Sequence, residues 1–350
     1  MILKKNLLYC LLTVSSYHIV SFGGVFTGLL PLFFLGLFKQ IEINSGKKAF
    51  YWGLANGMLI YSIHLRFFFN IFSTAAIVLW LILALWLALF FAAASHFDKR
   101  LSAKLKILAI PALYFSLEFF RSELYMLKFS WGTAGFQTFK NAQFLGVNFT
   151  GLYGFSLLLF VLVSLAMTLK NKLKIAAIST LCLLLTILSA IPQKSQLDNT
   201  TNSPLITGIQ LEFPDKKDLL AALDEALTKN PQSDIFMLSE YAINPFSTGV
   251  PQEILDWCRD NKKYIVGGAK FKHETIEDEF YNTATVINPQ GGIEFKQVKC
   301  TPIQFFKDGA AAQSQQLWNS PWGKIGLCIC YDLSYSRVTD ELIKMGRKLC

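Results

Sequence analysis

Residues 324–332 read KIGLCICYD, and in this stretch small and apolar residues lead directly into Cys330. The pattern predicts a buried strand over 322–330 that ends at the cysteine. A thiol in this position can act as a nucleophile when a neighbouring base removes its proton. An inert buried cysteine is the common alternative, because a free cysteine packs like a small apolar residue. Cys330 is therefore a candidate catalytic residue.

The residues on the amino-terminal side of this strand predict a layered α/β domain that begins near residue 205. Short apolar runs alternate there with amphipathic segments, as they do where helices pack on sheets. We expect strands at 205–211, 234–238, 264–270, 281–288 and 292–301 and helices at 217–229 and 252–261. Glu240 follows the second strand, where partial desolvation of a carboxylate favours a general base. A surface or capping glutamate is the common alternative.

The first half of the chain has the composition of a membrane domain. Of all residues, 53% are hydrophobic and only 16% are charged, which is far from the average of soluble proteins. Apolar segments near the roughly 20 residues that a bilayer helix needs cover 6–22, 24–38, 49–69, 71–95, 105–120, 144–169 and 173–191. We therefore expect seven membrane helices in 1–192, a polar linker at 193–204 and the α/β domain at 205–350.

Basic residues between the apolar segments predict the orientation of the membrane domain. Lysine and arginine gather before the first segment and in every second loop after it, as in 39–48, 99–106 and 170–174. Because short cytoplasmic loops collect these residues, the amino terminus is expected in the cytoplasm and residues 193–350 on the outer side. The net charge of +9 then reflects topology. We see no basic stripe or aromatic motif that indicates nucleic-acid binding.

The cysteines do not follow the spacing of a disulfide framework or of a metal site. There are seven of them, an odd number at irregular intervals, so most are expected to be unpaired. Cys328 and Cys330 lie too close together for a zinc ligand pair of the usual spacing. We expect neither a metal nor another cofactor.

Ordered sequence pieces in both halves resemble the membrane-bound apolipoprotein N-acyltransferases, a branch of the nitrilase superfamily. The pieces are Leu30–Leu32, Glu118–Arg121, Trp131–Phe136, Gly151–Ser156, Gly208–Gln210, Leu238–Ala242, Tyr281–Thr283 and Ile329–Asp332. The resemblance implies a four-layer α-β-β-α sandwich that carries a Glu-Lys-Cys triad. Glutamate is then the base, cysteine the nucleophile, and lysine steadies the oxyanion. Glu240 and Cys330 match the first and last of these positions.

The lysine of the implied triad has no direct match in this sequence. The family pattern is Tyr-x-Lys-x-x-Leu-Val-Pro-Phe-Gly-Glu, and an ungapped register on Pro302 aligns Gln297 with the lysine and Phe305 with the glutamate. Lys299 is expected on the same strand face as Gln297, about 7 Å along the strand, whereas Lys296 needs a bulge to turn inward. Gln297 and Lys299 are therefore both candidates for the third catalytic position.

The resemblance implies acyl transfer at the outer face of a bacterial inner membrane. Cys330 takes a fatty acyl chain from a membrane phospholipid as a thioester, and the chain then passes to the α-amine of a diacylglyceryl cysteine on a lipid-anchored apolipoprotein. We assign Tyr331, Asp332 and Trp131 to substrate binding. The expected partners are thus the phospholipid, the apolipoprotein and the membrane itself.

Two further functions stay open at this point. The outer domain of the family continues well past the cysteine, whereas this sequence ends at residue 350 in a segment that predicts an amphipathic helix. We expect an incomplete sandwich, which a second chain could complete. A catalytically impaired or truncated relative that only binds lipid is one alternative. A membrane-tethered amidase or nitrilase, which releases acid to water, is the other.

Overall fold

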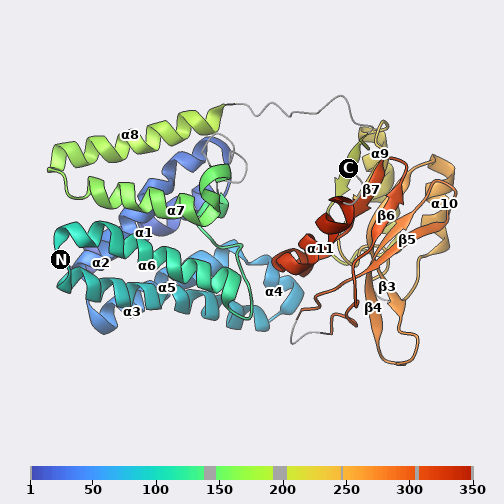
Figure 1. Cartoon of the computed structure of the whole chain (residues 1–350), viewed down its shortest axis with the longest axis horizontal. Helices are drawn as coiled ribbons and strands as arrows, with labels where there is room; N and C mark the ends of the chain where they lie inside the picture. The colour runs from blue at the N-terminus through green and yellow to red at the C-terminus, as the bar shows by residue number, and fades with distance from the viewer. Residues whose placement is uncertain (1, 138–146, 192–202, 246, 304–306, 348–350) are drawn as a thin grey trace. The chain divides into compact units, whose positions relative to one another are not determined.

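The computed structural model describes residues 2–137, 147–191, 203–245, 247–303 and 307–347 of the 350-residue chain. The chain divides into two compact units, Met1–Ser195 and Gln196–Cys350 (Figure 1). Most of the expected linker, at 192–202, lies outside the described residues. We describe each unit by itself.

The first unit consists of helices, which lie side by side in Figure 1. They are α1 (Ile2–Val20), the 3-10 helix η1 (Gly24–Leu29), α2 (Leu30–Ile43), α3 (Gly46–His64), α4 (Phe67–Phe72), α5 (Ala75–Arg100), α6 (Ala103–Phe119), the π-helix η2 (Phe120–Leu124), α7 (Val147–Ala166) and α8 (Asn171–Ala190). An aromatic core joins several of them, in which Phe34 of α2 stacks on Phe160 of α7 with ring centroids 4.7 Å apart.

Four helical segments of this unit are long and apolar enough to cross a membrane, as judged from the described residues. They are Gly24–Ile43, Ala75–Arg100, Phe149–Ala166 and Asn171–Ala190. The expected spans at 6–22, 49–69 and 105–120 are helical as α1, α3 and α6, but none of the three combines the required length with the required hydropathy. α6 is too short, with 17 residues. α1 and α3 both carry lysines near their start, which lower their mean hydropathy.

Two glycines allow α3 and α5 to pack closely. A Cβ atom on Gly57 would lie 2.6 Å from the Cα of Ala84, and a Cβ on Gly53 would lie 2.8 Å from the Cα of Ala88. Larger residues at either position would push the helices apart. Small residues therefore set the distance between these two helices, as they commonly do in membrane bundles.

The described part of the second unit contains a five-stranded and a two-stranded sheet. The first has the order β1 (Ile206–Ile209), β2 (Ile235–Leu238), β3 (Tyr264–Lys272), β4 (Phe280–Ile287) and β5 (Ile293–Val298). β1, β2 and β3 are parallel, whereas β4 runs antiparallel to both β3 and β5. The second sheet is a hairpin of β6 (Leu317–Ser320) and β7 (Gly323–Gly326).

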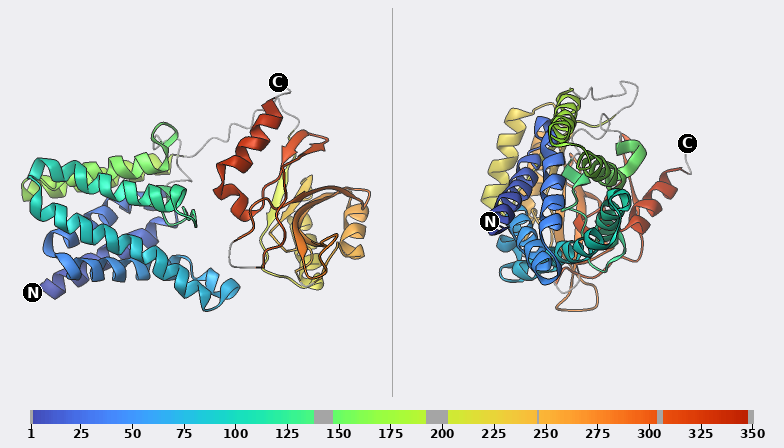
Figure 2. Two further views of the ribbon diagram at one scale, coloured as in Figure 1. Left: turned by 60° about the horizontal axis from the view of Figure 1, so that its bottom comes forward. Right: turned by 90° about the vertical axis from the view of Figure 1, so that its left-hand side faces the viewer.

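These elements form the expected α-β-β-α layers (Figure 2). Helices α9 (Lys216–Lys229) and α10 (Gln252–Asn261) pack on one face of the large sheet, for example through Trp257 against Phe236. The other face of the sheet shares a core with the β6–β7 hairpin, which includes Val286 and Trp318. Helix α11 (Ser336–Arg347) lies beyond the hairpin, where Leu342 approaches Gly326.

The strand expected over 322–330 is shorter than predicted. A turn at Pro321 and Trp322 joins β6 to β7, and it includes Gly323 at φ 115, a conformation that glycine adopts readily. β7 then ends at Gly326, so the chain has left the sheet before it reaches Cys330. Leu327 and Ile329 are still buried, which explains why their apolar pattern resembled a strand.

Candidate active site

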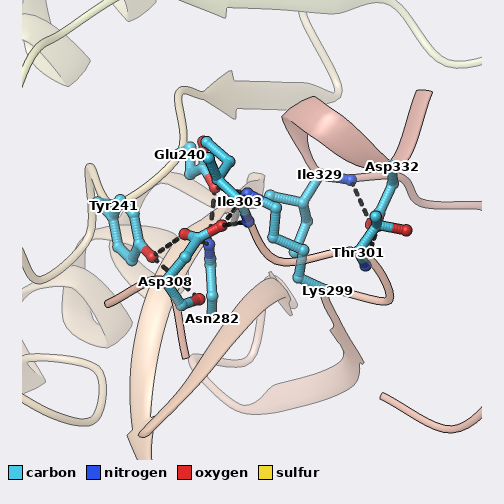
Figure 3. Close-up of polar contacts among 9 residues, drawn as sticks. All are labelled: Glu240, Tyr241, Asn282, Lys299, Thr301, Ile303, Asp308, Ile329 and Asp332. Atoms are coloured by element: carbon cyan, nitrogen blue, oxygen red, sulfur yellow. Dashed lines mark hydrogen bonds and ion pairs between the residues drawn. The ribbon is translucent and has the colours of Figure 1, made fainter. Parts of the chain in front are cut away.

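An ion cluster centred on Lys299 lies beside the large sheet in the second unit (Figure 3). The Nζ atom of Lys299 lies 2.7 Å from Oε1 of Glu240 and 2.8 Å from Oδ2 of Asp308. The lysine side chain is fully buried, with an exposed fraction of 0%. A buried charge needs both a counter-charge and hydrogen bonds, and these two carboxylates supply them.

The sheet brings the members of the cluster together. Glu240 lies just after β2, and Lys299 lies just after β5, where its backbone N–H still donates to the carbonyl of Asn282 on β4. The amide of Asn282 donates to Oε1 of Glu240 at 2.7 Å and to Oδ1 of Asp308 at 3.1 Å. Asn282 therefore fixes both carboxylates against the lysine.

Two further donors hold Asp308 in place. The hydroxyl of Tyr241 donates to its Oδ1 at 2.6 Å, and the backbone N–H of Ile303 donates to its Oδ2 at 2.7 Å. Each oxygen of Asp308 thus accepts from at least two groups when Lys299 and Asn282 are included. Its geometry is largely determined by these contacts, which in turn fix the position of the Lys299 ammonium.

Cys330 lies next to this cluster in a strained backbone conformation. It begins the 3-10 helix η4 (Cys330–Ser334) with φ 46, a region that residues other than glycine rarely occupy. The residue is exposed to solvent, and its thiol donates a hydrogen bond to the Glu240 carboxylate. Glu240 therefore contacts the thiol on one side and the Lys299 ammonium on the other.

The carboxylate of Asp332 stabilises the turn at Cys330. It is fully buried, and its carboxylate accepts the backbone N–H of Thr301 at 2.7 Å and that of Ile329 at 3.2 Å. Both oxygens are used by the fold, so the structure gives Asp332 a positioning role in place of the expected substrate contact. The turn at Cys330 is thereby tied to a residue two positions after Lys299.

The charges in the site shift the pKa values of the thiol and the lysine. Cys330 is exposed as a residue, but its sulfur is largely withdrawn from solvent. This desolvation and then the Glu240 carboxylate raise the pKa of the thiol to about 12, although Lys299 acts in the opposite direction. Burial lowers the pKa of Lys299, but the carboxylates of Glu240 and Asp308 raise it more, and the net shift is upward. At neutral pH the site thus contains a charged lysine and a protonated thiol that needs a base.

The structure separates the two candidates for the lysine position. Gln297 is buried, and its amide donates to the carbonyls of Val298 and Ser314, while its Oε1 accepts from the backbone N–H of Gln316. These bonds fasten the segment before β6, so Gln297 is not part of the cluster. Of the two candidates, Lys299 is the one that contacts Glu240. Phe305, aligned with the glutamate, lies outside the described residues.

The remaining expected site residues lie elsewhere. The ring of Tyr331 follows Cys330 and packs edge-on against Tyr335, with centroids 5.3 Å apart. Trp131 belongs to the first unit, between η2 and α7, where it packs against the rings of Phe67, Phe68 and Phe129. Its exposed fraction is 39%. Trp131 is thus part of an aromatic cluster of the helical unit.

Sequence reasoning did not identify Tyr241, Asn282 and Asp308. Tyr241 and Asn282 do fall inside two of the pieces that carry the family resemblance, and this was the available signal. Asp308 stands three positions after Phe305, just as Lys299 stands two positions after Gln297. A register with two residues fewer before Pro302 and three more after it would have aligned both charged residues. Within the described residues, no group of three His, Cys, Asp or Glu side chains could hold a metal ion.

Comparisons with solved structures find members of the nitrilase superfamily. Saccharomyces cerevisiae Nit3, from branch 10 of that superfamily, is 18% identical over 37% of this chain and 54% of its own, with a TM-score of 0.33. A carbon-nitrogen hydrolase from Helicobacter pylori is 18% identical over 39% and 55%, with a TM-score of 0.34. An amidase from Nesterenkonia is 14% identical over 40% and 60%, with a TM-score of 0.32. The chain thus spans little more than half the length of these structures.

A comparison with protein-family models finds a match in the helical unit. A search of curated proteins found no match. Residues 10–166 match the apolipoprotein N-acyltransferase N-terminal domain, a range that runs from α1 to the end of α7. Together with its apolar helices, this match identifies a membrane protein. Residues 10–166, the greater part of the helical unit, are therefore similar to the N-terminal domain of the apolipoprotein N-acyltransferases.

Proposed function

We propose that this chain transfers a fatty acyl chain from a membrane phospholipid to the N-terminal diacylglyceryl cysteine of an apolipoprotein, through a thioester on Cys330. One observation carries the proposal. The Glu240 carboxylate contacts both the thiol of Cys330 and the ammonium of Lys299. This contact network supports the roles of base for Glu240 and nucleophile for Cys330, with Lys299 as the neighbouring cation.

In the first half-reaction Glu240 takes the proton of the Cys330 thiol while the sulfur attacks the carbonyl carbon of the phospholipid ester. A base is needed here because the pKa of Cys330 is raised to about 12. The bond between the acyl carbon and the glycerol oxygen then breaks, and protonated Glu240 returns its proton to that oxygen. The products are a thioester on Cys330 and a lysophospholipid.

In the second half-reaction the α-amine of the apolipoprotein attacks the thioester carbonyl. Glu240 accepts a proton from the amine, the new C–N bond forms and the C–S bond breaks. The departing sulfur recovers the proton from Glu240, which regenerates the thiol. Lys299 holds the carboxylate in place throughout, and its charge favours the negative charge that develops near the thiol in both steps.

The proposal includes the location and the partners that the sequence predicts. The amino terminus lies in the cytoplasm of a bacterial cell, and residues 193–350 lie outside the inner membrane. The basic loops support this orientation. Both substrates are then anchored in the outer leaflet of that membrane. Trp131, in its partly exposed aromatic cluster, is a proposed contact for the lipid.

The experiment is to detect the acyl-enzyme. Full-length protein in phospholipid vesicles is incubated with a phospholipid that carries an alkyne-tagged acyl chain. We expect a hydroxylamine-sensitive label on the wild type and on Cys328→Ser, a matched variant that removes the thiol two positions away. Cys330→Ser should carry no such label. An equal label on Cys330→Ser would overturn the proposal.

Hydrolysis is a second candidate reaction, because the exposed position of Cys330 leaves the thioester accessible to water. A membrane-tethered amidase or nitrilase would use the same residues and release a free acid. Addition of a diacylglyceryl-cysteine peptide to the labelled enzyme separates the two reactions. Transfer predicts a labelled N-acyl peptide, whereas hydrolysis predicts labelled free fatty acid at a rate that the peptide does not change. A relative that only binds lipid would form neither product.

A further inference from the structure

A second lysine lies on the catalytic face of the large sheet. Lys270 of β3 is the cross-strand partner of Asn282 on β4, and Asn282 in turn pairs with Lys299 through the backbone bond described above. Cross-strand partners project from the same face of a sheet. Since neighbouring strands lie about 4.8 Å apart, the backbones of the two lysines are roughly 10 Å from each other. Lys270 therefore faces the same side as the catalytic cluster.

The ammonium group of Lys270 has surroundings unlike those of Lys299. Its Nζ atom lies 5.0 Å from the ring centroid of Tyr241 and 5.1 Å from that of Phe280, and it donates to the carbonyl of Pro245 at 2.6 Å. The ion pairs among the described residues do not include Lys270. Two aromatic faces and a carbonyl thus orient a partly buried cation, and none of the carboxylates that the structure describes forms an ion pair with it.

Tyr241 connects this cation to the reacting groups. It is the neighbour of Glu240 in the chain, and its hydroxyl donates to Asp308. The pKa of its phenol is raised by burial first and then by Asp308, with smaller effects of Glu240 and Cys330. The thiol is therefore close enough to Tyr241 to act on it electrostatically. The ring of Tyr241 thus lies between the ammonium of Lys270 and the cluster around Lys299.

We propose that Lys270 forms a subsite for the phosphodiester of the acyl donor. This inference rests on the proposed function. An ammonium has three N–H donors, and the carbonyl of Pro245 uses one of them, so two remain for anionic oxygens. In a phospholipid with an extended glycerol the phosphorus lies five covalent bonds from the carbonyl carbon of the nearer ester and six from that of the farther one, spans of roughly 6 and 7 Å at bond lengths of about 1.5 Å. These spans are of the same order as the distance of roughly 10 Å between the backbones of Lys270 and Lys299.

The test compares two acyl donors that differ in the phosphate group. Phosphatidylglycerol and 1,2-diacylglycerol are presented in the same neutral detergent micelles, and the rate of thioester formation on Cys330 is measured as kcat/KM. We expect Lys270→Met to lower this rate about tenfold or more for phosphatidylglycerol, chiefly through KM, and to leave the rate for diacylglycerol unchanged. Lys270→Arg, which keeps the charge, should retain most of the preference for phosphatidylglycerol.

Lys296 offers a matched control. Its Nζ atom also lies over an aromatic ring, 3.8 Å from the centroid of Phe271. Lys296 pairs with Thr285, which lies three positions from Asn282 along β4, and this odd number places Lys296 on the opposite side of the sheet. Lys296→Met should leave both rates unchanged. An equal loss for both donors in Lys270→Met, or no loss for either, would overturn the subsite.

A binding measurement separates this inference from the proposed reaction. Full-length Cys330→Ser, with and without Lys270→Met, is titrated with fluorescent phosphatidylglycerol and with fluorescent diacylglycerol in the same micelles. If the wild type forms no thioester but Lys270→Met weakens binding of phosphatidylglycerol alone by about tenfold, the subsite stands and the proposed reaction fails. If binding of both lipids is independent of Lys270, the subsite is wrong whatever the thioester assay shows.

Discussion

The two units of this chain both bury a carboxylate and a cation, but with different partners. In the membrane unit Glu118 accepts from the Tyr114 hydroxyl at 3.0 Å and the Ala134 N–H at 2.9 Å, and Arg121 donates to the Tyr61 hydroxyl at 2.6 Å. In the α/β unit Lys299 contacts two carboxylates directly. The membrane network thus consists largely of bonds between a charged group and a neutral one.

The difference indicates what each cluster does. The Glu118 and Arg121 contacts link α3, α6, η2 and the segment before α7, and all four side chains named above are at most 8% exposed. Such a network holds segments together. The Lys299 cluster instead ends at an exposed thiol through Glu240. We therefore expect changes in the membrane cluster to lower stability and changes in the α/β cluster to lower the reaction rate.

The largest combined effect on stability and rate is expected from Lys299→Met. The change leaves Glu240 and Asp308 next to each other without their counter-charge, and breaking a buried ion pair in this way costs about 3–5 kcal/mol of stability. The rate of thioester formation should fall by a further factor of about 100 to 1,000, the usual effect of removing one electrostatic stabiliser. Chemical denaturation and the alkyne-label assay measure the two effects.

Gln297→Leu is the control for this prediction. The side chain lies on the same strand face but bonds only to the segment around residues 298–316. We expect about 1–3 kcal/mol of lost stability, because its buried partners lose their hydrogen bonds. The rate at a temperature where the variant is folded should stay within about twofold of the wild type. The opposite result, a rate that depends on Gln297 and not on Lys299, would contradict the site described above.

Glu240→Gln is expected to change two reactions of Cys330 in opposite directions. Acyl transfer should fall by a factor of about 100 to 10,000, because the base is lost. The carboxylate is also a cause of the raised pKa of the thiol, so its removal lowers that pKa and increases the thiolate fraction. Alkylation by iodoacetamide at pH 9 should therefore be roughly tenfold faster in the variant for each unit by which the pKa falls.

The pH profile of alkylation checks the sign of this argument. In the wild type the rate should keep rising toward pH 12, since the folded-state pKa of Cys330 is about 12. In Glu240→Gln the profile should level off at a lower pH. Slower alkylation of the variant at every pH would mean that Glu240 stabilises the thiolate, and the assignment of a general base would fall.

The sequence alone predicted a membrane domain followed by an α/β domain, but it did not predict which residues surround Glu240. Glu240 and Cys330 could be chosen as candidates because each follows an apolar run and belongs to a recognisable motif. Lys299 and Asp308 could not be chosen over Gln297 and Phe305, because an ungapped alignment does not show where a strand ends and its side chains turn inward. Asp332 was assigned to substrate although it is buried, since its bonds to Thr301 and Ile329 depend on tertiary structure.

Glu118→Gln tests the membrane cluster. The amide keeps an acceptor for Tyr114 and Ala134 but removes the negative charge beside Arg121, so we expect a loss of about 1–3 kcal/mol in stability. Thermal unfolding in detergent measures this loss. The rate of thioester formation below the unfolding transition should be within about twofold of the wild type. A large loss of rate in a fully folded Glu118→Gln protein would instead give the membrane cluster a part in the reaction.

The smallest effects are expected from a matched pair of tyrosine changes, Tyr61→Phe and Tyr241→Phe. Tyr61→Phe removes the acceptor of a buried Arg121 N–H, so about 1–2 kcal/mol of stability should be lost with no change in rate.

Tyr241→Phe removes one donor from Asp308, but Lys299, Asn282 and the N–H of Ile303 remain. Its stability should therefore change by less than about 1 kcal/mol. Because Asp308 fixes the Lys299 ammonium, the rate of thioester formation should still fall a few-fold. If the ratio of lost stability to lost rate is the same in Tyr61→Phe and Tyr241→Phe, the Glu118–Arg121 network and the Lys299 cluster do not differ in the way that their contacts indicate.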